Sequence, residues 1–293
     1  MFKIFFEIFR FFLFCTPLVD FYRWPLLNIA IFSVSDSKRY SKDPTGVANF
    51  RPLPQEQTQD VVKKTFKGLG KNVPKLLQTD KYSLEIRNSL FRTKFVEEIL
   101  TGKLDPDNYL RFKVQNVVYL DHAAKMYSLA SNKMQIQGKQ EWFEFYRAQS
   151  EKHKKLYEQL LTTCGVKDAE SVAKGPAVKF YTDYLTVVAT DSPEYLAIAM
   201  LPCSNYWSLI ADYLEKDKRP MNAFKQKWIK ENKRTGVGST ETFVANHYKE
   251  EDFKPGLFHF CKASVAEVNT FQEAGGESLT EYLDILEACR KVQ

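Results

Sequence analysis

A single cysteine directly follows a proline in the stretch MLPCSNYW, residues 200–207. A proline inside a helix removes a backbone hydrogen bond and kinks the axis, and such a kink would direct the Cys203 side chain into a cavity. Tyr206, three residues later, shares its helix face. Because the thiolate is the reactive form, nucleophilic chemistry at Cys203 needs a proton acceptor or a positive dipole nearby. The alternative is a small buried side chain beside an ordinary kink, since free cysteine is among the most buried residue types.

A stripe of three polar side chains is a second candidate for chemistry. Asn116, Tyr119 and His122 are spaced by three residues, which places an amide, a phenol and an imidazole on one face of a predicted helix. An unpaired buried polar group costs about 1–3 kcal/mol. The three side chains must therefore satisfy one another or await a ligand, and the spacing leaves both outcomes open.

Glu267 lies among small and apolar residues on a helix predicted over residues 254–273. Burial on such a face would raise the pKa of the carboxyl and make it a proton donor near neutral pH. The alternative is a glutamate on a solvated edge. Tyr181 and Tyr184 repeat the pattern of inward phenols, for which core packing with one hydrated edge is the alternative explanation.

The elements that must position these residues are helices. Helical periodicity extends from Tyr82 to the end of the chain, and no segment alternates with period two for long. Asp105 followed by Pro106 predicts a helix start, Gly102 a helix stop, and Ser278 with Glu281 a capping box. The sequence predicts an all-α, compact bundle of seven or so helices over residues 76–293, with helices over residues 84–100, 105–132, 141–162, 176–188, 192–217, 222–233, 254–273 and 278–292, and a loop with a brief helix over 234–256.

Composition excludes several classes of protein. The 293 residues are 44% hydrophobic and 27% charged, as in a soluble globular protein. The net charge of +6 is spread over alternating acidic and basic residues, which gives no footprint for nucleic acid. Five widely spaced cysteines without a Cys-x-x-Cys pair favour neither a zinc site nor disulfides, and indicate a reducing, cytoplasmic location. No phosphate-binding glycine motif or hydrolase elbow occurs.

Residues 1–34 are strongly apolar but are interrupted by charges and prolines, so no run approaches the roughly 20 uncharged residues of a bilayer span. This segment could be a secretory signal ending near Ser35, a membrane-surface anchor or an upstream extension. Through it the protein could be secreted or touch a membrane. Residues 35–75 are rich in Ser, Pro, Gln, Lys and Gly, which is typical of a linker or a loosely packed arm.

Taken together, these stretches resemble the TenA/thiaminase II family of the TENA/THI-4/PQQC group, which has the haem-oxygenase-like helical fold. The resemblance leaves residues 1–75 unexplained and is carried by residues 95–104, 109–120, 180–182, 199–203 with Tyr206, 224–229 and Glu267. It implies a homotetramer without a cofactor and a pocket for an aminopyrimidine inside the bundle. Cys203 would be the nucleophile that adds to the ring, and Glu267 would handle the proton of the departing amine. The implied substrate-binding side chains are Asn116, Tyr119, Tyr181, Tyr206 and Trp207.

This chain departs from the family pattern at three positions. The family's Gln-Asp pair is Gln115-Asn116 here, and an amide can orient a ring but cannot exchange a proton; losing a general acid or base costs about 10²–10⁴ in rate. The tyrosine expected four residues after the cysteine is Trp207, and the tyrosine after the Lys-Trp-Ile element is Asn232. The nucleophile and the acid are kept, while the residues that would recognise the substrate have changed.

Three functions remain open at this point. The first is a TenA-like hydrolase that releases an amine from an aminopyrimidine, such as thiamin or a thiamin-breakdown product, or from a similar flat heterocycle. The second is a non-catalytic protein that binds a pyrimidine or another planar ligand in the same pocket, because Asn116 replaces an aspartate. The third is an iron or haem oxygenase; against a metal site, none of the four histidines has an acidic residue three positions earlier.

Overall fold

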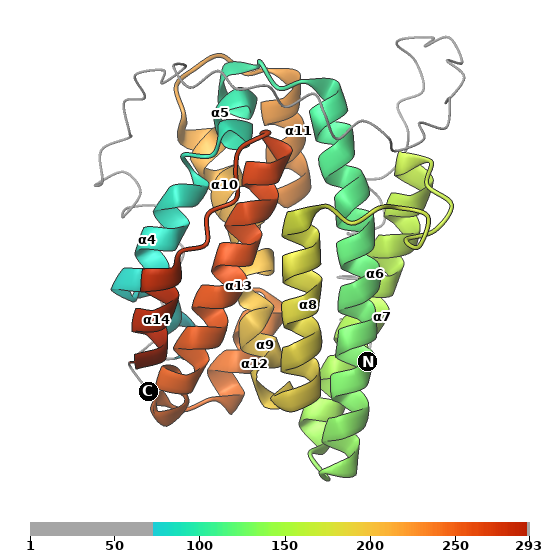
Figure 1. Cartoon of the computed structure of the whole chain (residues 1–293), viewed down its shortest axis with the longest axis vertical. Coiled ribbons are helices and arrows are strands. Elements are labelled where there is room, and N and C mark those ends of the chain that lie inside the picture. The colour runs from blue at the N-terminus through green and yellow to red at the C-terminus, as the bar shows by residue number, and fades with distance from the viewer. Residues whose placement is uncertain (1–72, 292–293) are drawn as a thin grey trace. The chain divides into compact units, whose positions relative to one another are not determined.

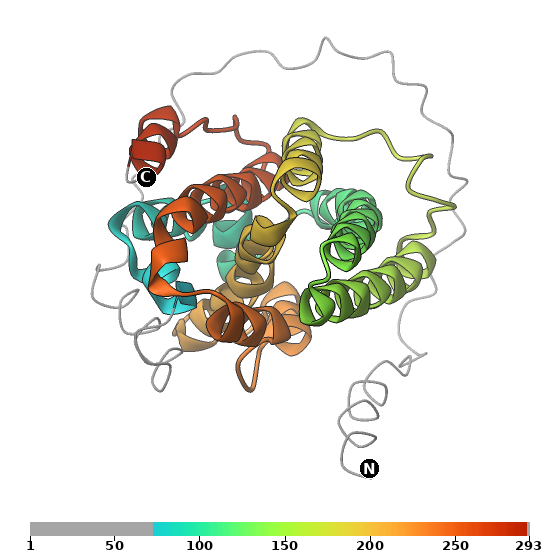
Figure 2. The same cartoon turned by 90° about the horizontal axis from the view of Figure 1, so that it is seen from below.

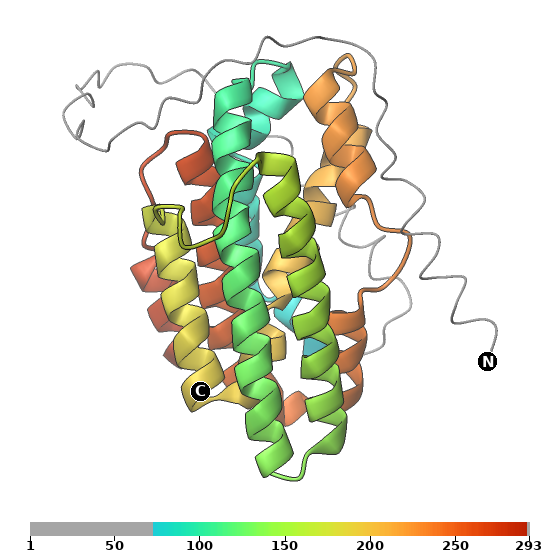
Figure 3. The same ribbon diagram turned by 90° about the vertical axis from the view of Figure 1, so that its right-hand side faces the viewer.

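The computed structural model describes residues 73–291, and every regular element in this range is helical, which confirms the all-α class (Figure 1). Four long helices run roughly along one direction: α6 (Pro106–Ile136), α7 (Gln140–Cys164), α8 (Pro176–Asp191) and α13 (Phe253–Ala274). Helix α8 lies between α6 and α13 and contacts both (Figure 1). Helix α7 packs along α6 (Figure 3).

The helix that carries Cys203 occupies the middle of this arrangement. Figure 2 shows α9 (Leu196–Ala199) and α10 (Leu201–Lys216), in gold, between α13 on one side and the α6–α7 pair on the other. The remaining elements close the two ends and the outer face, and are α3 (Val73–Thr79), α4 (Lys81–Leu90), α5 (Lys94–Thr101), η1 (Pro193–Tyr195), α11 (Ala223–Asn232), α12 (Ser239–His247), η2 (Glu250–Asp252) and α14 (Leu283–Lys291).

Several helix ends follow the local sequence signals. The Asp105 side chain accepts a hydrogen bond from the Asp107 amide at 2.8 Å, and Pro106 opens α6, where no amide donor is needed. Gly102 ends α5 with φ of 70°, a left-handed conformation that glycine adopts without a Cβ penalty. The Asn222 side chain accepts from the Lys225 amide and so begins α11. These predicted ends are confirmed.

Three predicted helices are wrong in their bounds, and the third is the one that contains Pro202. The single helix expected over residues 84–100 is two, α4 and α5, because the Thr93 hydroxyl donates to the Leu90 carbonyl and Thr93 itself adopts an extended conformation. The capping box at Ser278 does not form, and α14 begins only at Leu283. The preceding segment folds back on α13, where the Thr280 amide donates to the Asn269 side chain at 3.3 Å.

The chain around Pro202 restarts a helix rather than kinking one. The run predicted over residues 192–217 is divided into η1, α9 and α10, and Met200 separates the last two. Pro202 occupies the first turn of α10, where a missing amide donor costs little. Cys203 consequently lies in the first turn of a 16-residue helix, whose positive dipole end favours a thiolate.

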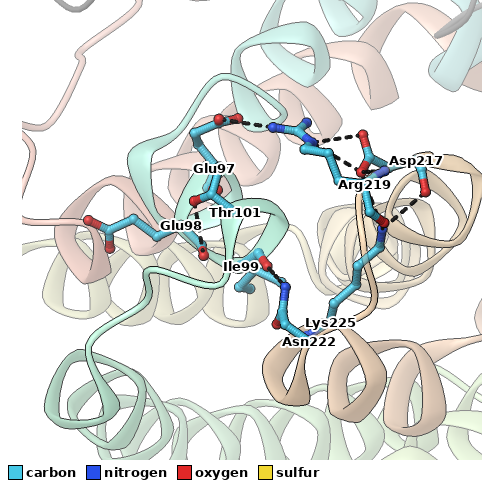
Figure 4. A network of polar contacts seen from close by, with 8 residues as sticks. All are labelled: Glu97, Glu98, Ile99, Thr101, Asp217, Arg219, Asn222 and Lys225. Carbon is cyan, nitrogen blue, oxygen red and sulfur yellow. Dashed lines mark hydrogen bonds and ion pairs between the residues drawn. The ribbon is translucent and has the colours of Figure 1, made fainter.

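A buried lysine network fixes α11 against α5 and α10 (Figure 4). The Lys225 side chain is 1% exposed, and its ammonium donates to the carbonyl and carboxylate of Asp217 and to the Arg219 carbonyl, at 3.0–3.2 Å. Arg219 bridges Asp217 and Glu97 of α5. The Asn222 side chain donates from Nδ2 to the Ile99 carbonyl, in the last turn of α5, at 2.8 Å. The network thereby fixes the helix whose Trp228 packs against the candidate site.

All described residues belong to one unit of the chain. The predicted N-terminal segment over residues 1–34, and most of the arm over 35–75, lie outside the described residues. Helix α3 begins at Val73, close to the start predicted for the helical domain at residue 76. Between residues 73 and 291, no helix is long and apolar enough to cross a membrane.

Candidate active site

Four helices bring Cys203, Glu267, Tyr119 and Tyr181 together. The rings of Tyr119 on α6 and Tyr181 on α8 lie 4.9 Å apart at 40°. The Tyr119 hydroxyl donates to the sulfur of Met200 at 3.6 Å and lies beside the Cys203 thiol. The Tyr181 hydroxyl lies beside the Glu267 carboxyl. The contacting rings of Tyr119 and Tyr181 therefore connect the side of the Cys203 thiol to the side of the Glu267 carboxyl.

Glu267 is a buried carboxyl rather than a residue on a solvated edge. Its side chain is 3% exposed and lies on α13 near Ser264 and Phe271, which are fully buried. The indole Nε1 of Trp207 donates to Oε1 of Glu267 at 2.6 Å. Burial raises the pKa of Glu267 to about 7, against the opposing effect of the Trp207 N–H and the Tyr181 hydroxyl. This carboxyl can both accept and donate a proton near neutral pH.

Cys203 differs from the core cysteines of the chain. Cys261 and Cys289 are fully buried, whereas Cys203 keeps part of its surface exposed. Burial and the nearby Glu267 charge raise the pKa of the Cys203 thiol far above its usual value, which the Tyr119 hydroxyl and two cations partly oppose. At rest Cys203 is thus a neutral thiol, and it needs a proton acceptor to react.

Two cations near Cys203 were missed by the sequence interpretation. Arg234, in the connection between α11 and α12, donates to the carbonyl of Ser204, to Asn205 Oδ1 at 3.1 Å and to Glu241 Oε2 at 3.4 Å. Lys152 reaches toward the thiol from α7, and both positive charges favour the thiolate. Nothing in the spacing of residues 234–256 could mark Arg234, because its contacts depend on how the connection folds back onto α10.

The polar stripe on α6 does not satisfy itself. His122 forms a 3.0 Å hydrogen bond with the hydroxyl of Thr186 on α8, so its ring serves helix packing. Tyr119 faces Met200 and Cys203. Asn116 is half-buried, and its side chain forms no hydrogen bond with any residue in the described part of the chain. Of the three, only the Asn116 side chain keeps its hydrogen-bonding groups available to a ligand.

Gln115, next to Asn116, and Asn232, at the end of α11, form hydrogen bonds that serve the fold. Gln115 donates to the Ala173 carbonyl and accepts from the Gly175 amide, both at 2.9 Å, and so fastens the segment that leads into α8. It thereby fixes the helix of Tyr181. Asn232 donates to the Trp228 carbonyl at 3.0 Å within α11.

The side chains of Tyr206 and Trp207, both on α10, contact different neighbours. Tyr206 is buried, and its hydroxyl lies beside Ser264 on α13 and Arg87 on α4. Trp207 is half-buried, and its ring packs on Phe112 and Trp228. Tyr206 therefore belongs to the wall behind the thiol–carboxyl pair, and Trp207 connects that pair to an aromatic cluster.

The described cysteines and acidic residues do not assemble a metal site. Within residues 73–291, no three His, Cys, Asp or Glu side chains lie close enough to hold an ion.

The fold and the site define an all-α bundle with a buried thiol–carboxyl pair between its central and outer helices. The model of the TENA/THI-4/PQQC family matches residues 83–246, more than half of the sequence, and the chain belongs to this family. The predicted resemblance is confirmed. The matched range includes Asn116, Tyr119, Tyr181 and Cys203 but ends before Glu267.

A solved structure is similar to this chain in fold. It is a TenA homologue protein from P. horikoshii OT3, with 18% sequence identity and a TM-score of 0.54. The alignment covers 70% of this chain and 99% of that chain. At this identity the likeness shows the fold alone. No curated protein matches the sequence.

Proposed function

We propose that this protein is a TenA-like hydrolase that releases an amine from an aminopyrimidine, such as thiamin or a thiamin-breakdown product, or from a similar flat heterocycle. The observation that carries the proposal is that the contacting rings of Tyr119 and Tyr181 connect the half-buried Cys203 to the buried Glu267 carboxyl, whose pKa is raised to about 7. Membership of the TENA/THI-4/PQQC family supports it.

The reaction begins with one proton shared by the pair. The Glu267 carboxylate accepts the proton of the Cys203 thiol, and Arg234 and Lys152 stabilise the thiolate. The sulfur then adds to an electrophilic carbon of the substrate ring. As the bond to an amino leaving group breaks, Glu267 returns the proton to the amine nitrogen; the thiazolium of thiamin instead departs as a neutral ring, and that proton passes to solvent. The adduct keeps an exocyclic double bond.

Water completes the cycle. It adds its hydroxyl to the exocyclic carbon and gives its proton to Glu267. The carbon–sulfur bond breaks, and Cys203 leaves as a thiolate that takes the proton back. The net change replaces the amine by a hydroxyl, and the thiol and carboxylate are restored. The tyrosine pair supports this chemistry, because Tyr119 and Tyr181 present ring surface and hydroxyls to a flat ligand.

The test is product analysis with thiamin and with an aminomethyl-pyrimidine. Mass spectrometry should detect the hydroxymethyl-pyrimidine with the wild-type chain and not with Cys203→Ala. Cys164→Ala is the matched control, because Cys164 is a half-buried thiol near the end of α7; it should keep the activity. Product formation that Cys203→Ala does not abolish would contradict the proposed mechanism.

A second candidate function is binding of a planar ligand without turnover. The observation that favours it is Asn116, whose side chain cannot exchange a proton and has no hydrogen bond within the described residues. Calorimetry and activity assays of Asn116→Asp separate the two functions. Hydrolysis that appears only in Asn116→Asp would indicate a binding protein on an enzyme scaffold, whereas hydrolysis already present in the wild type would exclude this candidate.

A further inference from the structure

Trp207 is tied to Glu267 and to the aromatic cluster at once. Its ring lies 5.4 Å from Phe112 at 29° and 5.1 Å from Trp228 at 24°. Phe112 and Trp228 are themselves only 6.0 Å apart, so both pack on the same side of the Trp207 ring. The indole N–H, at the edge of the ring, donates to Glu267 Oε1 at 2.6 Å.

The backbone of Trp207 is held as well. Trp228, which is 1% exposed, donates its own indole N–H to the Trp207 carbonyl at 3.2 Å. Trp228 belongs to α11, which the buried Lys225 fastens to the end of α10 (Figure 4). The position of the Trp207 N–H is therefore fixed by packing and by hydrogen bonds that do not involve Glu267.

An indole N–H differs chemically from a tyrosine hydroxyl at such a position. It donates a hydrogen bond and cannot accept one, whereas a hydroxyl can do either. The oxygen that faces Trp207 must accept whether Glu267 is ionised or protonated. The carbonyl oxygen of a protonated carboxyl is a stronger acceptor than its hydroxyl oxygen, so the Trp207 N–H favours a proton on the other oxygen, Oε2.

We infer that Trp207 is a positioning residue for Glu267: its N–H holds Oε1 as a permanent acceptor, so that Oε2 carries the proton that is exchanged with the thiol and the departing amine. This inference deepens the proposed function and rests on it. It assigns a role to the tryptophan that this chain has where the family pattern has tyrosine.

The N–H also sets the acidity of the carboxyl. A donor to the charged form of a carboxylate stabilises that form and lowers its pKa, opposing the effect of burial at Glu267. Removing the donor while keeping the ring should raise the pKa of Glu267 by about one to two units, because hydrogen bonds to charged groups are of that strength.

The decisive variant is Trp207→Phe, which keeps aromatic packing and removes the N–H. Infrared difference spectra of the ligand-free protein follow the carboxyl C=O band through a pH titration, with Glu267→Gln identifying the band. We expect its midpoint to rise by about one to two pH units in Trp207→Phe. This readout needs no turnover, so it decides the inference even if the proposed hydrolase activity fails.

Activity gives the second readout. The pH at which kcat/KM falls on the acid side should move upward by the same amount in Trp207→Phe, while KM changes little. Phe112→Leu is the control, because it loosens the same cluster and keeps the N–H; its titration midpoint should stay at the wild-type value. An unshifted midpoint in Trp207→Phe, or an equal shift in Phe112→Leu, would overturn the inference.

A shape-matched analogue guards against misfolding of the variant. β-(3-Benzothienyl)alanine, incorporated in place of Trp207, replaces the N–H by sulfur and preserves the bicyclic ring. Circular dichroism should show a wild-type fold, and the carboxyl midpoint should rise as in Trp207→Phe. A folded analogue protein with the wild-type midpoint would refute the role of the N–H.

Discussion

Arg234 donates a hydrogen bond to the backbone carbonyl of Ser204, the residue that follows Cys203. A side chain from the connection between α11 and α12 is thereby fixed to the first turn of α10, and Glu241 on α12 holds its guanidinium from the other side. Two positive elements, this guanidinium and the start of α10, consequently lie near the same thiol.

Removing the Arg234 charge should make Cys203 less reactive. A nearby positive charge lowers a thiol pKa, so Arg234→Gln should slow alkylation of Cys203 by iodoacetamide at fixed pH by about three- to tenfold. Peptide mass spectrometry resolves Cys203 from the other cysteines. Lys233→Gln is the matched control, since Lys233 pairs with Glu215 on the surface; equal slowing in both variants would show that Arg234 has no specific effect.

The shared proton predicts a one-sided pH profile. Below about pH 7 Glu267 is protonated and cannot accept the thiol proton, so kcat/KM for amine release should fall about tenfold per pH unit. Above pH 7 the pair holds a single proton and the rate should reach a plateau, because the pKa of Cys203 lies far higher. Stopped assays from pH 5 to 9 measure this profile, and a maximum near pH 5 would contradict the assignment of Glu267 as acceptor.

The buried Glu267 carboxylate should lower the free energy of unfolding at high pH. Its pKa is raised from an ordinary value of 4.5 to about 7, so the folded state binds this proton more tightly than the unfolded state does. Stability should therefore fall as pH rises from 4.5 to 7, by about 3 kcal/mol in total, and stay constant above. Glu267→Gln should be more stable than the wild type at pH 8 and equal to it at pH 4, measured by urea denaturation. Equal free energies of unfolding for the wild type and Glu267→Gln at both pH values would contradict this prediction.

Local signals predicted most of the helices, because their causes are contained in a few neighbouring residues. Asp105 and Gly102 act through their own side chain or backbone conformation. The break at Thr93 is also local, but threonine has no strong helix-stop signal, and its bond to the Leu90 carbonyl was not predicted. The late start of α14 depends on how the preceding segment folds back on α13, where Thr280 contacts Asn269, and spacing does not show this.

The residues and contacts of the candidate site likewise divide into those that the sequence predicted and those that it did not. Cys203 and Glu267 were identified through a motif and a family resemblance, and the structure adds the side chains around each of them. The Trp207–Glu267 hydrogen bond and the Arg234 contacts arise between residues from different helices and connections. Periodicity assigns side chains to one face of a helix but does not show which neighbouring helix that face contacts.

Lys225 should be essential for stability although it is remote from the thiol. Lys225→Met keeps the length of the side chain but leaves the Asp217 and Arg219 carbonyls without the ammonium donor and the Asp217 carboxylate with Arg219 alone. Breaking such a buried, hydrogen-bonded charge network costs about 3–5 kcal/mol. Lys227→Met is the matched control on the same helix, because its ammonium is half exposed and pairs with Glu231 only at 4.0 Å; exposed pairs contribute about 0–1 kcal/mol. Urea denaturation should show a large loss of unfolding free energy for Lys225→Met alone, and similar losses in the two variants would show that the network does not fix α11.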